Sequence, residues 1–543
     1  MNDRRLKHWG WGYEDQQRPA HEVEEAAAGI RAMLGFGGEA QSAVPLADAT
    51  IRDARLAVPG SVTPGLFTDD RHDRAVHALG KAYRDIVRGH RGEFPNPPDL
   101  VAFPASESEV VEVLDRASEL DAVVIPFGGG TSVVGGVEPR LADDRPSISL
   151  DLTRLNQVLE IDGVSLAARI QGGVRGPALE EQLKSEGLTL RHYPQSFEYS
   201  TLGGWIVTRA GGHFATGETH IDDLTESVRA ITPSGEWQSR RLPGSGAGPS
   251  PDRMMLGSEG ILGVVTEAWM RVRPRPVFKA SATVEFPDFV AAATGAVREI
   301  AQSRLGPSNC RLIDPLEALT MGAGDGRATL LLLGFESADV PVGVLLDQAI
   351  SIAESNGGQV ASRKVVEPTG DDDGTTAGSQ SDKWKDAFLL APYIRDTFVC
   401  CGVLSETFET ATTWDRFGTF HAEVIGAARR AVAEVCGAPA EGEGAPRVSC
   451  RLTHVYPDGA APYFTVIAPA IRGGELEQWD EIKAAASEAI IENGGTITHH
   501  HAVGRDHRPW YDQQRPDLFA SALGAAKREI DPKGMLNPGV LLG

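Results

Sequence analysis

The sequence predicts an α+β protein with more than one domain, and three observations support this prediction. Its 543 residues exceed what one ordinary hydrophobic core accommodates. Short apolar, β-branched runs alternate with short amphipathic helices and end at glycine-rich turns, as where residues 122–125 lead into Gly128-Gly129-Gly130. The sequence pattern changes after Pro274-Arg275-Pro276, where longer strand and helix patterns begin.

Four regions are expected along the chain. Residues 1–94 are predicted to be mixed helix and loop, and the prolines that follow Phe94 mark a boundary. Residues 95–275 and 276–500 are expected to form two larger units, the second of α/β type, and residues 501–543 form a closing segment. The predicted helices are at 20–35, 70–90, 107–117, 177–186, 287–302 and 342–356, and the predicted strands are at 100–104, 122–125, 148–152, 167–171, 280–286 and 329–335. Mobile loops are expected at 242–252, 367–381 and 437–446.

Composition narrows the function classes. The chain has 52 basic and 75 acidic residues, so the net charge is 52 − 75 = −23 and no nucleic-acid partner is expected. Its five cysteines form no C-x-x-C pair, which predicts neither a disulfide framework nor a zinc site and favours a cytoplasmic setting. We find no signal peptide, no apolar run of the roughly 18–20 residues of a membrane span and no peroxisomal signal. The sequence leaves open whether the protein contacts a membrane surface peripherally.

The segment 126–136 is a candidate anion-binding loop. It follows an apolar strand and contains three adjacent glycines, which can take positive φ and turn successive backbone N–H groups to one side. Such a concavity binds anions, and Thr131 and Ser132 add hydroxyl donors. The loop could cradle a pyrophosphate, or it could be a tight turn without a ligand. It lacks the G-x-G-x-x-G pattern of dinucleotide-binding folds, so any nucleotide is held by another architecture.

Two further stretches have a similar character. In 194–217 and 256–265, small residues, hydroxyls and paired glycines alternate with bulky apolar residues, which suits neither a plain helix nor a plain strand. Backbone packed closely against a flat ligand explains this pattern. Each stretch alone could be a turn. Together with the 126–136 loop, however, they make three such stretches within about 140 residues, which favours a large cofactor.

Several longer motifs together resemble the FAD-linked oxidases related to vanillyl-alcohol oxidase, and within them the alkyldihydroxyacetonephosphate synthase branch. The segments that carry the resemblance are Trp9–Tyr13, Phe197–Trp205, Cys310-Arg311-Leu312-Ile313-Asp314, Tyr393-Ile394-Arg395-Asp396, Glu406–Thr410, Trp414-Asp415-Arg416, Ala461–Phe464, His499-His500-His501 and Asp531–Gly539. The resemblance runs along nearly the whole chain.

The resemblance implies a two-part FAD-binding domain of the PCMH type, an α/β cap domain and a C-terminal tail that returns to the flavin. No histidine lies in the glycine loop, so FAD is expected to bind non-covalently. The residues expected to contact FAD are Pro126, Gly128, Gly129, Gly130, Thr131, Ser132, Pro194, Ser196, Ser200, Thr201, Gly203, Gly204, Trp205, Glu259, Gly260, Gly263, Val264 and Asn537.

The implied reaction exchanges the acyl group of acyl-dihydroxyacetone phosphate for a long-chain alcohol, with the flavin N5 bonding transiently to the substrate carbon and no net redox change. Arg311 and Arg395, with Arg451 as a third candidate, have the planar charge that suits the phosphate. Tyr463, His499, His500 and His501 are the expected acid and base groups.

Each of these residues has a plainer interpretation. An arginine is often a surface ion-pair partner, a tyrosine such as Tyr463 is often a core aromatic, and a histidine cluster can bind a metal. No second ligand cluster lies at a usual sequence spacing, so no metal is predicted. In an extended segment, His499 and His501 would face one side and His500 the other.

Two other functions remain open. The same arginines could hold the carboxylate of a 2-hydroxy acid, such as D-lactate or glycolate, in a FAD-linked oxidoreductase, with a histidine taking the hydroxyl proton. A non-enzymatic flavin-binding scaffold would require the histidine triplet to be dispensable. The expected partners are a small lipid-like substrate and a second copy of the chain in a homodimer.

Overall fold

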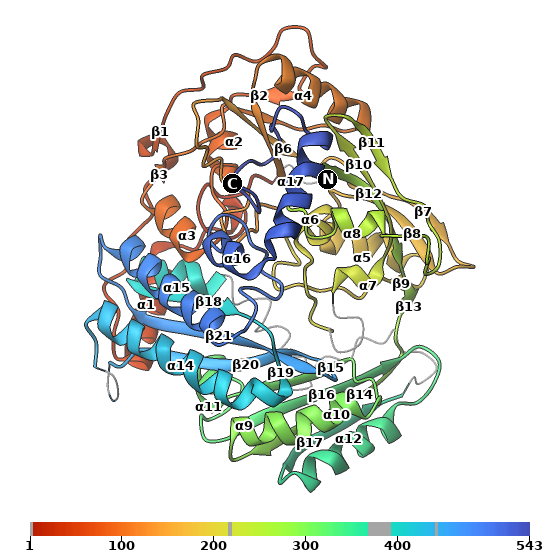
Figure 1. Cartoon of the computed structure of the whole chain (residues 1–543). Helices are drawn as coiled ribbons and strands as arrows, with labels where there is room; N and C mark the ends of the chain where they lie inside the picture. The colour runs from red at the N-terminus through yellow and green to blue at the C-terminus, as the bar shows by residue number, and fades with distance from the viewer. Residues whose placement is uncertain (1–3, 215–219, 368–392, 440–441, 443) are drawn as a thin grey trace.

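The computed structural model describes residues 4–214, 220–367, 393–439, 442 and 444–543 (Figure 1). Of the loops that the sequence predicts to be mobile, 367–381 lies outside these residues except for its first position, and 437–446 lies partly outside them. Loop 242–252 is irregular up to its last two residues, which begin a short helix.

The first half of the chain builds two sheets. A four-stranded sheet has the order β2-β4-β6-β5, in which β4, β6 and β5 are parallel, and a five-stranded antiparallel sheet has the order β11-β10-β12-β8-β7. The strands are β2 (Phe67–Thr68), β4 (Leu100–Ala102), β5 (Val123–Phe127), β6 (Ser147–Asp151), β7 (Val158–Asp162), β8 (Ala167–Gln171), β10 (Thr225–Thr232), β11 (Gly235–Gln238) and β12 (Val264–Arg271), with a small pair β9 (Leu188–Thr189) and β13 (Arg273–Pro274). The helices are α4 (Glu107–Glu119), α5 (Gly176–Lys184), α6 (Leu202–Thr208), α7 (Ile221–Leu224) and α8 (Pro251–Met255).

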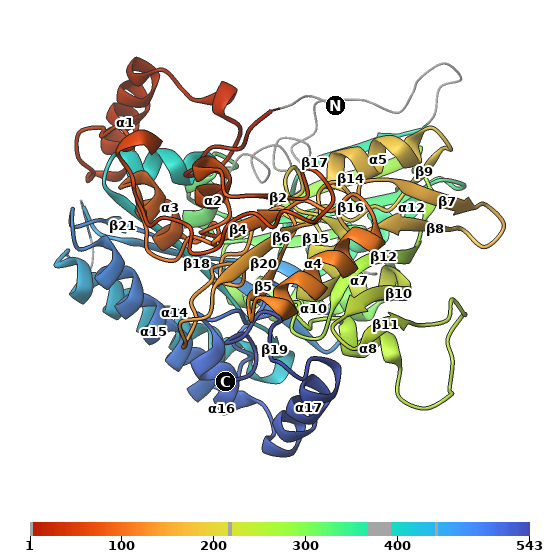
Figure 2. The same cartoon turned by 90° about the horizontal axis from the view of Figure 1, so that it is seen from above.

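The second half builds one large antiparallel sheet, called the cap sheet here, with the order β17-β14-β16-β15-β20-β21-β18. Its strands are β14 (Phe278–Phe286), β15 (Asn309–Ile313), β16 (Thr329–Ser337), β17 (Gln359–Val366), β18 (Val403–Glu409), β20 (Arg447–Val455) and β21 (Gly459–Pro469), and β19 (Thr412–Thr413) pairs with β21. The accompanying helices are α9 (Phe289–Ala292), the π-helical turn η3 (Ala293–Val297), α10 (Arg298–Gln302), α11 (Pro315–Thr320), α12 (Gly343–Ser355), α14 (Trp414–Cys436) and α15 (Glu475–Glu492). In both views α14 and α15 lie side by side (Figures 1 and 2).

Side-chain alternation gives the cap sheet two different faces. In β21, Phe464 and Val466 belong to the large hydrophobic core shared with α12 and α14, whereas Tyr463, Thr465 and Ile467 line an internal cavity. Because successive residues of a strand point to opposite faces, one strand serves both the core and the cavity. The same alternation recurs in β18 and β20, so one face of the sheet builds stability and the other faces the site described below.

The amino-terminal region wraps around the junction of the two halves. It contains η1 (Glu14–Gln16), α1 (Ala20–Leu34), η2 (Leu46–Asp48), α2 (Arg71–Val76), α3 (Tyr83–His90) and the strand pair β1 (Thr50–Ile51) and β3 (Glu93–Phe94). The single helix predicted at 70–90 is wrong, because residues 77–82 interrupt it. At this interruption Gly80 packs against the Ser132 carbonyl so closely that a Cβ would lie 2.3 Å from the oxygen.

The other helices and strands predicted from the sequence are present with small shifts at their ends. The prediction missed several strands, however: β7, β10, β11, β12 and β17, and the four cap strands β15, β18, β20 and β21. The four cap strands carry buried polar residues such as Arg311, Glu406, Arg451 and Tyr463 among their apolar ones, which obscures the alternation expected of a strand. Three of them, β18, β20 and β21, supply much of the cavity wall.

The C-terminal segment returns to the first half of the chain, after α16 (Arg508–Gln514) and α17 (Asp517–Ile530). Leu536 pairs with Val124 at the edge of β5, and Asn537 donates to the backbone oxygens of Gly136 (3.1 Å) and Glu259 (2.8 Å). Arg505 in turn donates to the Asn537 side-chain oxygen at 3.1 Å. A single amide side chain therefore joins the glycine loop, the 257–263 segment and the tail.

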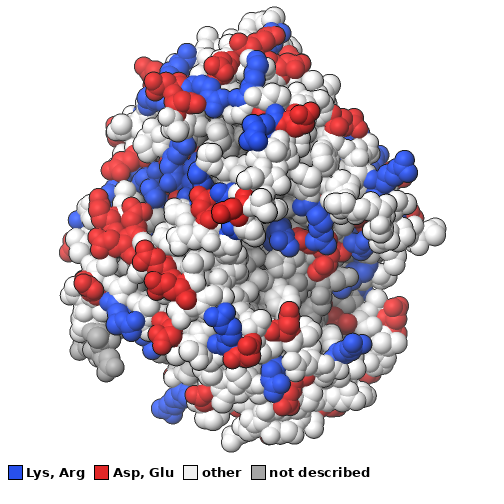
Figure 3. Space-filling model, in the orientation of Figure 1, with Lys and Arg blue, Asp and Glu red and all other residues white. Residues whose placement is uncertain are grey.

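The surface carries both signs of charge. On the face in Figure 3, Lys and Arg side chains are interspersed with Asp and Glu. Among the described residues, no helix combines the length and apolar character needed to cross a membrane.

Asn537 offers a test of the tail attachment. It has φ of 38°, a region in which asparagine and glycine are tolerated better than alanine. We expect Asn537→Gly to lower the free energy of unfolding by about 2–3 kcal/mol through its lost hydrogen bonds, and Asn537→Ala to lower it by about 1 kcal/mol more through backbone strain. Urea denaturation followed by circular dichroism measures both, and equal stability of the two variants would contradict the strain argument.

Candidate functional site

One internal cavity lies between the cap sheet and the first half of the chain. Its wall contains the glycine loop, residues from 194–212, the 259–263 segment and the cavity-facing residues of β18, β20 and β21. His500, His501, Ala502 and Asn537 from the C-terminal part complete it. Segments that lie far apart in the sequence therefore converge on one space.

The structure brings nearly all the residues that the sequence singled out to this cavity. Every residue expected to contact a cofactor lines it except Val264, which is buried in β12 opposite Ile231 and packs into a core cluster. Arg395, Arg451, Tyr463, His500 and His501 also line it. Arg311 and His499 do not belong to the lining.

The glycines of the 126–132 loop are required by its packing as well as by any ligand. A Cβ on Gly128 would lie 2.2 Å from the Thr201 hydroxyl, and one on Gly129 would lie 2.0 Å from the Tyr199 carbonyl oxygen. Two loops of the cavity wall therefore cross at a distance that excludes any side chain. Gly130 adds a positive φ of 64°.

The same loop presents unused hydrogen-bond donors. Within the part of the chain that the structure describes, the backbone N–H groups of Gly129, Gly130 and Thr131 have no protein acceptor. Buried backbone donors are normally paired, so a run of free ones that lines a cavity suits an anionic ligand. The loop therefore has the donor set of an anion cradle.

Arg451 and Tyr463 form a pair across neighbouring strands. They face each other in the register of β20 and β21, and the Arg451 guanidinium carbon lies 3.9 Å from the centre of the Tyr463 ring. Arg451 also forms an ion pair with Glu317, which is fully buried. Burial raises the pKa of Tyr463, so its phenol stays protonated and can donate a hydrogen bond.

The other two arginines occupy different positions. Arg311 on β15 is fully buried, its guanidinium lies 3.2 Å from the His213 ring nitrogen, and burial with Arg451 nearby lowers its pKa to about 9. Arg395 lines the cavity and is half-buried, and among the residues that the structure describes it donates only long hydrogen bonds, to the Lys81 carbonyl (3.4 Å) and the Thr407 hydroxyl (3.5 Å). Arg395 is thus the lining arginine with the weakest protein partners.

The segment that carries Arg395 is held by the amino-terminal residues 7–11. The Asp396 carboxylate accepts from the Trp11 backbone N–H at 2.7 Å and from Lys7 at 3.3 Å, and Gly10 packs directly against it. Trp11 itself lines the cavity. The sequence motifs contained these residues, but nothing in their spacing showed that they meet.

Glu409 at the end of β18 organises the histidine triplet. Its buried carboxylate accepts from the backbone N–H groups of His499 (2.7 Å), His500 (3.1 Å) and His501 (2.9 Å), and from the Thr498 hydroxyl (2.6 Å). Three successive amides can converge on one carboxylate only if the segment is curled, so the extended geometry expected from the sequence is wrong. His500 and His501 both face the cavity, and His499 lies outside it.

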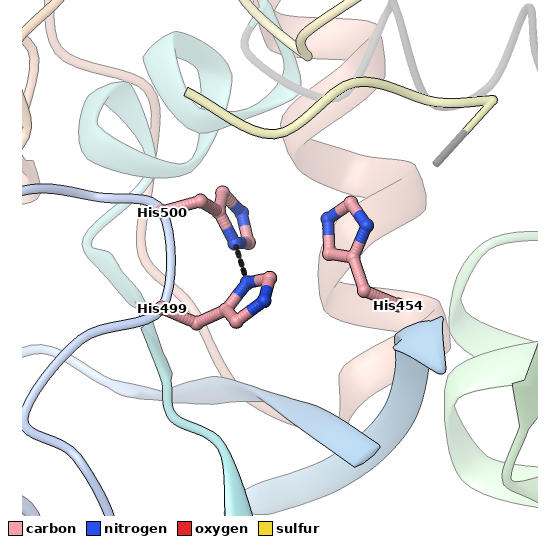
Figure 4. A group of neighbouring side chains, drawn as sticks. All are labelled: His454, His499 and His500. Carbon is pink, nitrogen blue, oxygen red and sulfur yellow. Dashed lines mark hydrogen bonds between the residues drawn. The ribbon is translucent and has the colours of Figure 1, made fainter. Parts of the chain in front are cut away.

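Further rings that the sequence did not single out surround His499. The ring nitrogens of His454, His499 and His500 lie within 4.8 Å of one another (Figure 4), and His499 also contacts Tyr456 and His220. His454 reaches this position because a register shift in β20 turns consecutive residues toward the cavity. These residues come from separate segments, so sequence spacing could not reveal the group.

Burial controls the charge of this histidine cluster. Desolvation lowers the pKa of His454, His499 and His501 well below the usual range and that of His500 to about 3. The rings are therefore neutral near pH 7, and each presents one donor and one acceptor nitrogen. Burial by itself would raise the pKa of Glu409. The nearby His501 and the hydrogen bonds to the carboxylate outweigh this effect, so the pKa of Glu409 is lowered.

Comparison with known proteins shows which family has this architecture. The family described as FAD binding domain matches residues 98–239, and the family described as FAD linked oxidases, C-terminal domain, matches residues 275–541. The alkyldihydroxyacetonephosphate synthase of Dictyostelium discoideum is 30% identical over 498 residues, covering 88% of this chain and 79% of that protein. The chain belongs to the FAD-linked oxidase family.

Other relatives agree. The Caenorhabditis elegans alkyldihydroxyacetonephosphate synthase is 32% identical over 86% of this chain and 79% of that protein. A solved structure of an alkyldihydroxyacetonephosphate synthase superposes with a TM-score of 0.79 at 26% identity, covering 98% of both chains. A p-cresol methylhydroxylase structure, at 14% identity, has a TM-score of 0.66 over 96% of this chain and 97% of that one, which shows the shared fold.

The matched domains indicate FAD as the cofactor and confirm the α+β fold with a PCMH-type FAD-binding domain and a second, C-terminal domain. The residues present fit FAD. The free amides of the glycine loop suit a pyrophosphate, and the glycines near 203 and 260 let the backbone approach a flat ring closely. Glu259, whose carboxylate accepts the backbone N–H groups of Val503 and Gly504 (both 2.8 Å), holds the C-terminal segment against this wall.

Gly129 offers a test of the cradle. Because a Cβ there would overlap the Tyr199 carbonyl, we expect Gly129→Ala to separate the two loops and to purify with less than about a tenth of the FAD of the parent protein. Gly163 lies in an open turn with no atom near its Cβ position, so Gly163→Ala is the matched control and should retain FAD. The flavin-to-protein absorbance ratio measures both, and full occupancy in Gly129→Ala would contradict the packing argument.

The buried neutral histidines predict a pH dependence of stability. The pKa of His500 is lowered when the protein folds, so the unfolded chain binds a proton that the folded chain refuses between about pH 3 and pH 6.5. Stability is therefore lost as pH falls below 6.5. We expect His500→Gln to reduce this slope by about 1.4 kcal/mol per pH unit in urea denaturation. The same change at the exposed His21 on α1 should leave the slope unaltered.

Proposed function

We propose that the chain is an alkyldihydroxyacetonephosphate synthase, which replaces the acyl group of acyl-dihydroxyacetone phosphate by a long-chain fatty alcohol. The proposal rests on relatives of that name at 30–32% identity and on the composition of the cavity. FAD, bound non-covalently, supplies the reactive isoalloxazine ring. The substrate is a lipid-like small molecule.

One observation carries the proposal. A single cavity is lined by the flavin-facing loops, by arginines, by histidines with a tyrosine, and by apolar residues. The apolar part contains Met321, Ile394, Phe398 and Ile467, which come from three different segments. A substrate with a phosphate at one end and an alkyl chain at the other needs this combination, whereas a short hydroxy acid has no group for the apolar part.

The arginines have distinct roles under this proposal. Arg395 is the phosphate ligand, because it lines the cavity and its protein hydrogen bonds are long. Arg451 contributes positive charge from a position fixed by Glu317 and Tyr463. Arg311, on the neighbouring strand β15, lies outside the lining and acts on the site through Arg451 and His213.

Proton transfer falls to Tyr463, His500 and His501. The Tyr463 phenol is kept protonated by burial and can donate to the departing carboxylate oxygen. A neutral imidazole of His500 or His501 can accept the proton of the incoming alcohol. His499, outside the lining, serves these groups indirectly.

A second candidate function has a specific observation in its favour. The glycolate oxidase subunit GlcD of Bacillus subtilis is 25% identical over 82% of this chain and 89% of that protein. In a FAD-linked oxidation of a 2-hydroxy acid, Arg395 and Arg451 would hold the carboxylate. The homodimer and the peripheral membrane contact stay predictions.

Substitution of Arg395 tests its proposed role as the phosphate ligand. With palmitoyl-dihydroxyacetone phosphate and radiolabelled hexadecanol, the purified protein should form a labelled ether product. Arg395→Ala should raise KM about 10- to 100-fold through the loss of a charged hydrogen-bond pair, and Arg395→Lys should give an intermediate value because it keeps the charge without the planar fork. Both variants should retain FAD.

The competing function has its own readout. Anaerobic mixing with glycolate or D-lactate should leave the flavin absorbance unchanged under the synthase proposal and should bleach it if the chain oxidises hydroxy acids. Bleaching without ether formation would replace the first function by the second.

A further inference from the structure

A row of hydrogen-bonded rings leads away from the cavity wall. The His500 Nδ1 atom lies 3.1 Å from the His499 Nδ1 atom (Figure 4). The His499 Nε2 atom lies 2.6 Å from the Tyr456 hydroxyl and 3.1 Å from the His220 Nε2 atom, and the last two groups are 3.2 Å apart. Each ring thus contacts the next through an atom that can donate or accept a proton.

The row crosses from the inside to the outside of the site. His500 lines the cavity, whereas His499, Tyr456 and His220 do not. Tyr456 lies where β20 ends, beside the exposed turn residues Pro457 and Asp458, and both Tyr456 and His220 are partly exposed. The row therefore begins at the substrate and ends near the surface.

Hydrogen-bond partners decide which nitrogens carry protons. The His220 Nδ1 atom lies 3.1 Å from the Arg209 carbonyl oxygen, which only accepts, so Nδ1 is protonated and Nε2 of the neutral ring is bare. Two bare nitrogens do not face each other at 3.1 Å, so His499 carries its proton on Nε2. Its Nδ1 atom is then the acceptor of a proton on His500 Nδ1.

Glu409 supports the same arrangement. One of its carboxylate oxygens lies 3.4 Å from the His500 Nδ1 atom, which favours a proton there. The remaining nitrogen of His500, Nε2, is consequently bare. A ring of the cavity wall is thereby prepared as a proton acceptor by contacts that extend to Arg209.

We propose that His500, His499, Tyr456 and His220 form a proton relay that carries the substrate proton from the cavity to the solvent. This inference rests on the proposed function. When an alcohol R–OH displaces a carboxylate from an ester carbon, the C–O bond to the carboxylate breaks and the C–O bond to the alcohol forms. The products are an ether, a carboxylate and one proton, which has to leave the enclosed site.

The relay moves that proton by a series of transfers between neighbouring groups. His500 accepts it on Nε2 and passes the proton on Nδ1 to His499 Nδ1. His499 passes its Nε2 proton to the Tyr456 oxygen, and the Tyr456 hydroxyl proton moves to His220 Nε2. His220, at the partly exposed end, releases a proton to water. His499 and His220 are then positioning and relay residues, and His500 is the catalytic residue that meets the substrate.

The proton positions can be measured without a substrate. In the FAD-loaded protein labelled with ¹⁵N-histidine and assigned by single histidine variants, long-range ¹H–¹⁵N correlation at pH 7.5 should show protons on His220 Nδ1, His499 Nε2 and His500 Nδ1. A proton on His220 Nε2 or on His499 Nδ1 would overturn the relay. So would a stoichiometric metal ion in elemental analysis that is lost in His454→Ala, because a metal held by His454, His499 and His500 would occupy the same nitrogens.

The rate of turnover provides a second test of the relay. With whichever substrate the flavin site accepts, Tyr456→Phe and His220→Gln should slow turnover about 100-fold, raise the solvent deuterium isotope effect and recover when imidazole is added. Tyr511→Phe, a half-buried tyrosine outside the cavity and the row, is the matched control and should keep parent activity. Slowing without imidazole rescue or an isotope effect would indicate a structural role and overturn the relay. Absence of ether formation with the expected proton positions would instead overturn only the synthase assignment.

Discussion

The site depends on one buried carboxylate. Glu409, at the end of a cap-sheet strand, accepts hydrogen bonds from three successive backbone amides and one hydroxyl of the segment that follows α15. A buried charge is stable only when such partners are complete, so the carboxylate and the curled segment require each other. This interaction links the large sheet of the second half to the chain that closes the cavity, and it determines which histidines face inward.

The cap sheet shows how one element serves stability and chemistry together. Phe464 and Val466 contribute to the hydrophobic core, whereas Tyr463 and Thr465, which alternate with them along β21, line the cavity. The polar residues are tolerated because they face a cavity rather than the core, and because Arg451 is paired with Glu317 and stacks on Tyr463. A second division of labour applies to the glycine loop, whose glycines satisfy both close backbone packing and the approach of an anion.

Low polarity gives the histidine cluster its character. Burial lowers the pKa of His220, His499 and His500, so these rings stay neutral, and they are joined to one another and to Tyr456 by hydrogen bonds. In such a group the proton on one nitrogen decides the proton on the next. The Arg209 carbonyl at one end of the row therefore influences the basicity of His500 at the other, which a list of individual residues does not convey.

The amino-acid sequence by itself determined the α+β class, the glycine loops with their strand, the FAD-linked oxidase resemblance and the residue types of the site. These features depend on local pattern and motif, such as Gly128–Gly130 after an apolar strand. Tertiary structure alone decided the rest. The cap strands were hidden because buried polar residues interrupt their alternation, and the helix at 70–90 is broken by the close packing of Gly80. That His499 and Arg311 lie outside the cavity lining, and that His220, His454 and Tyr456 join the triplet, all follow from contacts between segments more than 40 residues apart.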